Sequence, residues 1–142
     1  PARAEPASAR PVKRALQILL EQPALAEQAG NLTLLAQSDA PGVHLLVEAL
    51  DYFQAHPGHR AAQLLNSWGD SPRTAALTRL MEERLTLDEA ELEHEFRDSL
   101  AHLAQKGLRA RVEQLLAEAR LRPLTEAETR EIAAVTRELA HK

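Results

Sequence analysis

The chain has 142 residues, which is the size of one domain or of one domain with an appendage. Its apolar residues are mostly leucine and alanine, and the β-branched and aromatic residues that strands favour are scarce, so we expect an all-α protein. The absence of cysteine excludes disulfides and thiolate zinc sites, and neither a signal peptide nor an apolar run long enough to span a bilayer is present. We therefore expect a cytoplasmic protein, and the net charge of −4 argues against a general nucleic-acid binder.

The first ten residues read PARAEPASAR, a composition that is typical of an extended linker. A frayed terminus leads to the same local expectation. Because the sequence begins at Pro1 without an initiator methionine, we expect it to be a piece of a longer protein.

Helices are predicted from the end of this linker onward. The first covers 11–21, with Pro11 in its first turn, and a short second helix covers 24–28 and stops at Gly30. Residues 31–37 are apolar without a clear period, so we expect an irregular segment there.

Three further helices are predicted before residue 85. One begins at a cap formed by Ser38 or Asp39 and ends before Pro57, the next covers 59–67, and the last runs from Ser71 to about residue 84. The apolar spacing of these helices and of 11–21 predicts the following buried residues: Val12, Leu16, Leu19, Leu20, Val43, Leu46, Val47, Leu50, Phe53, Ala62, Leu65, Ala76, Leu77, Leu80 and Met81.

The longest predicted helix covers 87–122, with Asp88 as its N-cap. Its one glycine, Gly107, weakens a helix without ending it, so we expect a single helix with a bend there; a helix broken at Gly107 is the alternative. Two apolar stripes lie roughly 150° apart at about 100° per residue. They consist of Leu92, Phe96, Ser99, Leu100 and Leu103, and of Leu108, Val112, Leu115 and Ala119. We therefore expect the helix to pack against two bodies, the segment before it and the segment that follows it.

A last helix follows the turn around Pro123. Thr125 and Glu128 have the spacing of a capping box, which marks its start. One face carries Ile132, Val135, Thr136, Leu139 and Ala140 and can fold back on 108–119 as a hairpin. Two helices cannot enclose a core, so the apolar surface of this hairpin is covered either by the bundle or by another protein.

No pattern in the sequence indicates catalysis, since a Gly-rich loop after a strand and a nucleophile elbow are both missing. His94, Asp98 and His102 share one helix face, but residues spread over two turns cannot close a metal shell alone. We therefore predict no catalytic residues, no metal and no cofactor.

Two small groups of cations remain. Lys13, Arg14 and Arg79 flank the apolar Val12 and Leu16, which would suit the acidic end of a peptide if the two helices are neighbours. Ordinary solvated side chains would give the same pattern. The second group, Arg137 with His141, points away from the inner stripe of the hairpin, although cations at a helix C-terminus are also favoured by the helix dipole.

The order of several motifs carries a resemblance that covers nearly the whole chain after the linker. The motifs are LQILLEQPALA at 16–26, PGVHLLVEALDYFQAHPG at 41–58, AAQLLNSW at 61–68, AALTRL at 75–80, EFRDSLAHL at 95–103 and the terminal TRELAHK. In this order they resemble the C-terminal helicase-binding domain of the bacterial replicative primase, DnaG. The ordered set is specific, whereas no single motif is.

The resemblance implies a bundle of about six helices followed by a helical hairpin. It implies that the hairpin and its tip bind the N-terminal domains of the hexameric helicase DnaB and recruit primase to the replication fork. The implied helicase-binding residues are Val112, Leu116, Leu121, Leu124, Arg137 and His141.

The resemblance also implies that the bundle binds the acidic C-terminal tail of the single-stranded DNA-binding protein. The matching residues are Val12, Lys13, Leu16 and Arg79. Part of the family's basic wall lies before the first helix, where this chain has its linker, so we expect a weaker pocket or one that uses Arg10.

We interpret the chain as a non-catalytic interaction domain with a linker (1–10), a helical bundle (11–107) and a C-terminal hairpin (108–142). It is expected to be a monomer alone, without membrane binding or strong direct nucleic-acid binding. The zinc-binding and polymerising domains of a primase are not in this sequence, so it should synthesise nothing, although the longer parent would be a DNA-directed RNA polymerase. The alternatives are a helical adaptor of another pathway and a helical hydrolase, which would need a buried carboxylate–histidine site.

Overall fold

The computed structural model describes residues 10–83 and 85–140, and in this part of the chain all regular structure is helical, as the sequence predicts. The linker predicted for 1–10 lies outside the described residues, except that Arg10 begins the first helix. The elements in order are α1 (Arg10–Glu21), the 3₁₀ helix η2 (Pro23–Ala29), α2 (Thr33–Ala36), α3 (Val43–Ala55), α4 (Ala61–Trp68), α5 (Pro72–Met81), α6 (Glu89–Ala119) and α7 (Glu126–Ala140).

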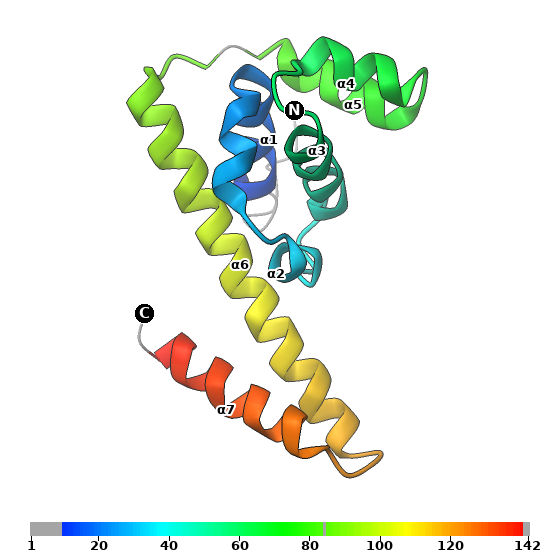
Figure 1. Cartoon of the computed structure of the whole chain (residues 1–142), viewed down its shortest axis with the longest axis vertical. Helices are drawn as coiled ribbons and strands as arrows, with labels where there is room; N and C mark the ends of the chain where they lie inside the picture. Colours follow the sequence, from blue (N-terminus) through cyan, green and yellow to red (C-terminus); the bar gives the residue numbers. More distant parts are fainter. Residues whose placement is uncertain (1–9, 84, 141–142) are drawn as a thin grey trace, which may run out of the picture.

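The long helix α6 connects two bodies of different size (Figure 1). Its first half packs against α1, η2 and α2, and together with α3, α4 and α5 these helices form the bundle. Its second half runs on past the bundle, and α7 folds back against it to form the hairpin, which consists of residues 108–119, the turn and α7. The pair opens as a V toward the end of α7, so the hairpin projects from the bundle.

The core of the bundle is built around α1, which has neighbours on several sides. Ala15, Ile18 and Leu19 are fully buried there, and Leu46 of α3 and Phe96 of α6 reach the same core. Full burial of a side chain of this size contributes about 1.5–3 kcal/mol. The bundle therefore has a core of its own, without any contribution from α7.

The helix starts predicted from the capping residues Ser71 and Asp88 are confirmed. The Ser71 hydroxyl accepts a hydrogen bond from the Thr74 amide at 3.3 Å, and the Asp88 carboxylate accepts one from the Glu91 amide at 2.9 Å. These side chains bind orphan amides of the first turn within their own segment, so sequence alone is enough to place them.

The segment between η2 and α3 differs from the prediction. Residues 33–36 form α2 rather than an irregular segment, because Leu35 is buried under the core and the first turn is held by Asn31, whose side chain accepts from the Thr33 amide at 2.8 Å. The start predicted for α3 at Ser38 or Asp39 is also wrong. Ser38 instead accepts from the Ala40 amide in a turn, and α3 begins after Gly42, which has a φ of +81°.

Two residues that the sequence predicts to be buried, Ala62 of α4 and Met81 of α5, are exposed. Ala61 and Leu64 are the buried residues of α4, whereas the predicted Ala62 is exposed and Leu65 is half-buried. Met81 at the end of α5 is 44% exposed. A short amphipathic helix is rotated by its neighbours, so a shift of one position in register is within what packing decides.

Gly107 has a different role from the one its sequence context suggests. The helix α6 is unbroken through this position, so the predicted single helix is confirmed and the alternative of a break is wrong. A Cβ at position 107 would lie 1.9 Å from the carbonyl oxygen of Leu34, because α2 crosses α6 at this point. The glycine therefore permits close approach of two backbones and does not mark a hinge.

Candidate functional site

The inner face of the hairpin holds α6 and α7 together with few residues. Leu108 and Leu115 of α6 and Val135 of α7 are buried, while Ile132 and Leu139 are half-buried. The predicted stripe is confirmed for these residues. It is wrong for Ala119, Thr136 and Ala140, which are exposed. Thr136 and Ala140 lie toward the end of α7, where α7 diverges from α6.

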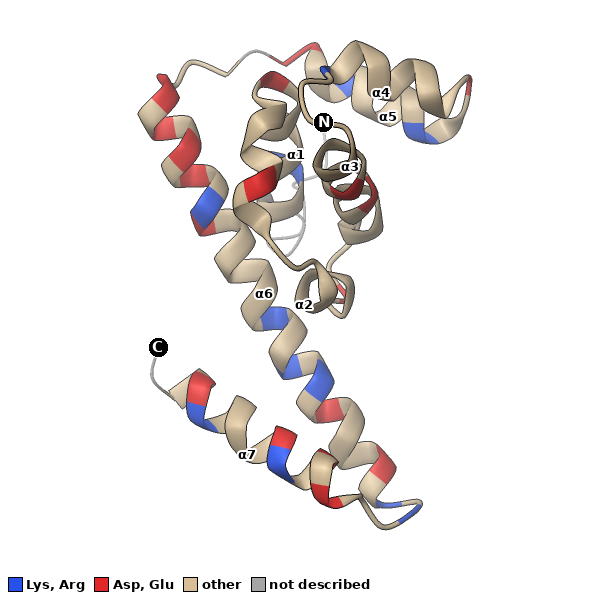
Figure 2. Ribbon diagram, in the orientation of Figure 1, with Lys and Arg blue, Asp and Glu red and all other residues tan. Residues whose placement is uncertain are grey.

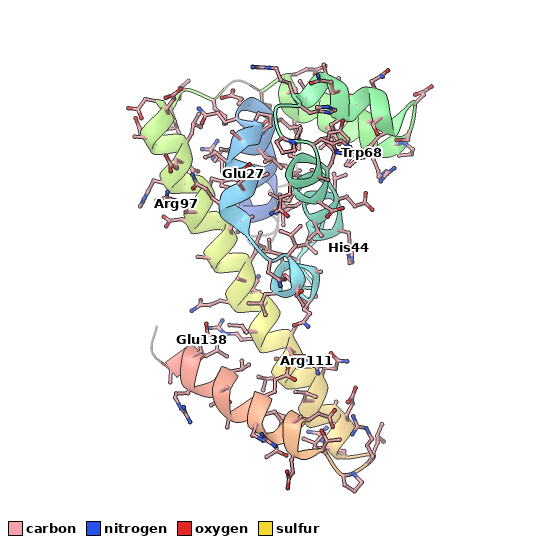
Figure 3. All side chains as sticks on the ribbon, viewed as in Figure 1. Glu27, His44, Trp68, Arg97, Arg111 and Glu138 are labelled. Carbon is pink, nitrogen blue, oxygen red and sulfur yellow. The ribbon has the colours of Figure 1, made fainter. Side chains whose placement is uncertain are left out.

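An ion pair closes the middle of the hairpin. The Arg111 guanidinium donates two parallel hydrogen bonds to the Glu131 carboxylate, at 2.7 and 3.1 Å, and Figure 3 labels Arg111 on the second half of α6. This contact raises the pKa of Arg111 and lowers the pKa of Glu131. The bidentate geometry fixes the register of the two helices.

A second arginine organises the turn between the helices. The Arg122 guanidinium donates to Glu118 at 2.6 Å and to both oxygens of Glu128, at 2.7 and 2.9 Å. Glu128 also accepts from the Thr125 amide at 2.9 Å, and its own amide donates to the Thr125 hydroxyl, so the predicted capping box is confirmed. The hydrogen bonds from Arg122 and Thr125 lower the pKa of Glu128 to about 2. The carboxylate is therefore ionised throughout neutral and mildly acidic solution.

The hairpin exposes apolar side chains at its outer end. Three large apolar residues are exposed in the described part of the chain, and two of them, Leu116 at 50% and Leu121 at 87%, belong to the hairpin. Val112 and Leu124 belong to the same hairpin and are half-buried. The four apolar residues implied for helicase binding thus all belong to the hairpin, and two of them are exposed.

The two cations implied for the same site cannot both be placed. Arg137 is exposed on α7, on the side away from the buried Val135. His141 lies outside the described residues.

The residues implied for acidic-peptide binding have mixed environments. Val12 and Leu16 are buried in the bundle core, at 3% and 2% exposure. The Lys13 ammonium lies 3.4 Å from the Glu83 carboxylate, whereas Arg79 is exposed and makes no ion pair among the described residues. The two cations therefore lie near the surface, whereas the side chains of Val12 and Leu16 are covered by the rest of the bundle.

The residues considered for metal binding or catalysis have ordinary surroundings. His94 lies 3.3 Å from Asp98 on an exposed face, and within the described ranges no group of three or more histidines and carboxylates could hold a metal. The buried polar side chains of the same ranges are Gln17, Ser38 and Ser99. None of these is a carboxylate or a histidine, whereas the hydrolase alternative needs a buried carboxylate together with a histidine.

The charged residues that order the hairpin are not all apparent from the sequence; they are Arg111, Glu118, Arg122 and Glu131. Glu118 and Arg122 have the i, i+4 spacing of a helical ion pair, which is a readable signal. Arg111 and Glu131 are 20 residues apart and meet only when α7 folds back. No local pattern indicates that pair.

The long helix, the bundle and the projecting hairpin match one family. The model of the family described as "DNA primase DnaG DnaB-binding" matches residues 12–135, which include the bundle and most of the hairpin. The chain belongs to the DnaB-binding domain family of the primase DnaG. The resemblance inferred from the motif order is thereby confirmed.

Relatives of this DnaG-family chain are longer proteins. It is 34% identical over 125 residues to the DNA primase of Salmonella typhimurium and 29% identical over 135 residues to that of Pseudomonas putida. These alignments cover 88% and 95% of this chain but 22% and 20% of the relatives, so the chain spans about a fifth of their length.

A solved structure has the same architecture. The DnaG primase C-terminal domain from Vibrio cholerae is 28% identical and superposes with a TM-score of 0.79, covering 89% of this chain and 96% of that domain. This chain therefore shares the all-α fold of that domain. Within the described residues, no helix has both the length and the apolar character that crossing a membrane requires.

Proposed function

We propose that this chain is the non-catalytic domain through which a primase binds the N-terminal domains of a DnaB-type helicase, and that it thereby recruits primase to the replication fork. The observation that supports this most is the apolar end of the hairpin, where Leu121 is 87% exposed. Exposed apolar side chains that cluster on a projecting element are typical of protein interaction sites. Because α7 has no place in the bundle core, the hairpin is free to bind a large partner.

The binding surface that we propose contains Val112, Leu116, Leu121, Leu124 and the cations Arg137 and His141. The bundle (11–107) acts as the base from which the hairpin (108–142) projects. We further infer that the domain acts in the cytoplasm as a monomer until it meets the helicase. It should bind nucleic acid weakly at most, because acidic residues gather on the first half of α6 (Figure 2).

Replacing Leu121 by serine should weaken helicase binding about 30-fold, because a central apolar contact contributes about 2 kcal/mol or more. Met81→Ser is the matched control, since Met81 is also exposed but lies at the end of α5 in the bundle. The measurement is a titration of labelled chain with the hexameric helicase, alongside circular dichroism. Equal losses for the two variants, or none for Leu121→Ser, would place the contact elsewhere.

A second function, binding of the acidic tail of single-stranded DNA-binding protein, is supported by the exposed Arg79 of α5 and by Lys13 of α1, the helix that packs against α5. Glu83 already pairs with Lys13, and Val12 and Leu16 are buried, so an acidic peptide must displace one carboxylate and move side chains to reach the apolar floor. We therefore propose a weak site whose affinity comes mainly from the two cations.

The double variant Lys13→Glu with Arg79→Glu should weaken binding of an acidic peptide with an apolar C-terminal residue about tenfold at low salt. The affinity of the wild-type chain should also fall as salt rises, because the contact is between exposed charges. Fluorescence anisotropy of the labelled peptide measures both effects. Arg130→Glu, on α7, serves as the control and should change nothing; unchanged affinity in the double variant contradicts the assignment.

A further inference from the structure

The hairpin tip, residues 120–124, combines an exposed apolar side chain with an ordered backbone. The amides of Leu121 and Arg122 both donate to the Glu118 carbonyl, at 2.9 and 3.0 Å, which continues the last turn of α6. Leu121 itself is 87% exposed. Nothing among the described residues covers its side chain, so the backbone of the turn decides where its Cα–Cβ bond points.

Arg122 connects every part of this turn. Its guanidinium reaches the end of α6 through Glu118, the start of α7 through Glu128 and the turn itself through the Pro123 carbonyl at 3.1 Å. The Glu128 side chain is only 17% exposed and is also hydrogen-bonded to the Thr125 amide, so the acceptor is itself held in place. One side chain thus bridges three consecutive segments.

A network of this kind has a different effect from that of a single surface ion pair. An isolated exposed pair contributes little to stability, since solvent screens it and side-chain entropy opposes it. A planar guanidinium that donates to several acceptors at once restricts the positions of all of them. The main consequence of the Arg122 contacts is therefore a reduced conformational freedom of the turn rather than a more stable bundle.

We propose that Arg122 is a positioning residue for helicase binding, which holds the hairpin tip so that Leu121 enters an apolar recess on the helicase without reordering. This inference rests on the helicase-binding function proposed above. Pre-organisation of this type increases affinity, because the turn loses its conformational entropy when the chain folds and has none left to lose when the helicase binds. Arg122 acts through Leu121, since both terminal nitrogens of its guanidinium already donate to Glu118, Glu128 and Pro123.

A double-mutant cycle separates this role from direct contact. The wild-type chain, Leu121→Ala, Arg122→Gln and the double variant are each titrated with the hexameric DnaB-type helicase. We expect Arg122→Gln to weaken binding about fivefold when Leu121 is present. In the Leu121→Ala background the same change should alter the affinity by less than about 1.5-fold, because residues that act as a unit are not additive. Arg122→Lys should fall between wild type and Arg122→Gln, since it keeps the charge without the bidentate geometry.

Hydrogen exchange provides a readout that does not involve the helicase. In Arg122→Gln the amides of residues 121 and 122 should exchange faster, while those near Leu115 keep their protection. Arg130→Gln is the matched control, because Arg130 makes a single i, i+4 contact with Glu126 on an exposed face of the same hairpin. It should change neither exchange nor affinity.

The outcomes distinguish the inference from the function on which it rests. If the wild-type chain binds helicase but Arg122→Gln has the same effect in both backgrounds, or no effect at all, the positioning role is wrong and the function stands. Unaltered exchange at 121 and 122 in Arg122→Gln likewise contradicts it. If the wild-type chain does not bind helicase, both the proposed function and a docking role for Arg122 are wrong.

Discussion

Replacing Gly107 by alanine should lower the free energy of unfolding by about 3 kcal/mol or more, the upper end for overpacking a tight contact. The added methyl group would lie 1.9 Å from the Leu34 carbonyl oxygen and 2.9 Å from its carbon, and both are backbone atoms. Neither α2 nor α6 can yield by a side-chain rotation. The bundle must therefore separate the two helices or distort one of them.

Whether alanine lowers or raises the free energy of unfolding distinguishes two roles for Gly107. At a helical hinge without close neighbours, alanine would stabilise the chain by about 0.5–1 kcal/mol, because glycine is the weaker helix former. Urea unfolding followed by circular dichroism measures the difference, and the melting temperature should fall by about 10 °C. Arg109→Ala, at an exposed position two residues further along α6, is the control and should stay within about 0.5 kcal/mol of wild type. An unchanged or more stable Gly107→Ala variant would contradict the packing role.

Deleting the last eight residues should abolish helicase binding, with a loss of about 100-fold or more, while the bundle stays folded. The deletion removes Val135, the buried residue of α7, together with the half-buried Leu139 and the exposed Arg137. The nine residues of α7 that remain, 126–134, are too few to be stable as a helix without tertiary contacts. Because the core of the bundle contains no residue of α7, its stability should be nearly unaffected.

The measurement is helicase titration paired with circular dichroism and thermal unfolding of the truncated chain. The control is Arg137→Ala with His141→Ala, which keeps Val135 and Leu139 and so keeps the hairpin closed. This double variant should weaken binding by about 1 kcal/mol if the outer face of α7 is an average part of the interface. If it binds like wild type, the inner stripe becomes the better candidate for the contact. Full binding by the truncated chain would show that α7 is dispensable.

The helices that the sequence predicts most accurately are those whose ends depend on nearby residues. Ser71, Asp88 and the Thr125–Glu128 capping box each bind an amide within three residues, so their identity and spacing are sufficient. The all-α class follows from composition. The two stripes of α6 follow from periodicity, which the burial of Phe96 and Leu115 confirms.

Other features of the fold depend on neighbours that the sequence does not place next to each other. Residues 33–36 have too short a pattern to indicate a helix, and α2 forms because Leu35 is buried under the core. The register of α4, with Leu64 buried instead of Leu65, is decided by what packs against it. In both cases burial free energy outweighs the weak local preference of a short segment.

For the proposed binding surface, the sequence by itself determined the family, the existence of the hairpin and which apolar residues belong to it. Only the tertiary structure decided how these residues are presented. Arg111 meets Glu131, and Gly107 meets Leu34, across separations of 20 and 73 positions, because α6 carries one face against the bundle and another against α7. Hydrogen bonds and steric contacts act over a few ångströms in space, so no local pattern records them. The exposure of Leu121 has the same origin, since a leucine in a turn is buried or exposed according to what folds over it, and here nothing among the described residues does.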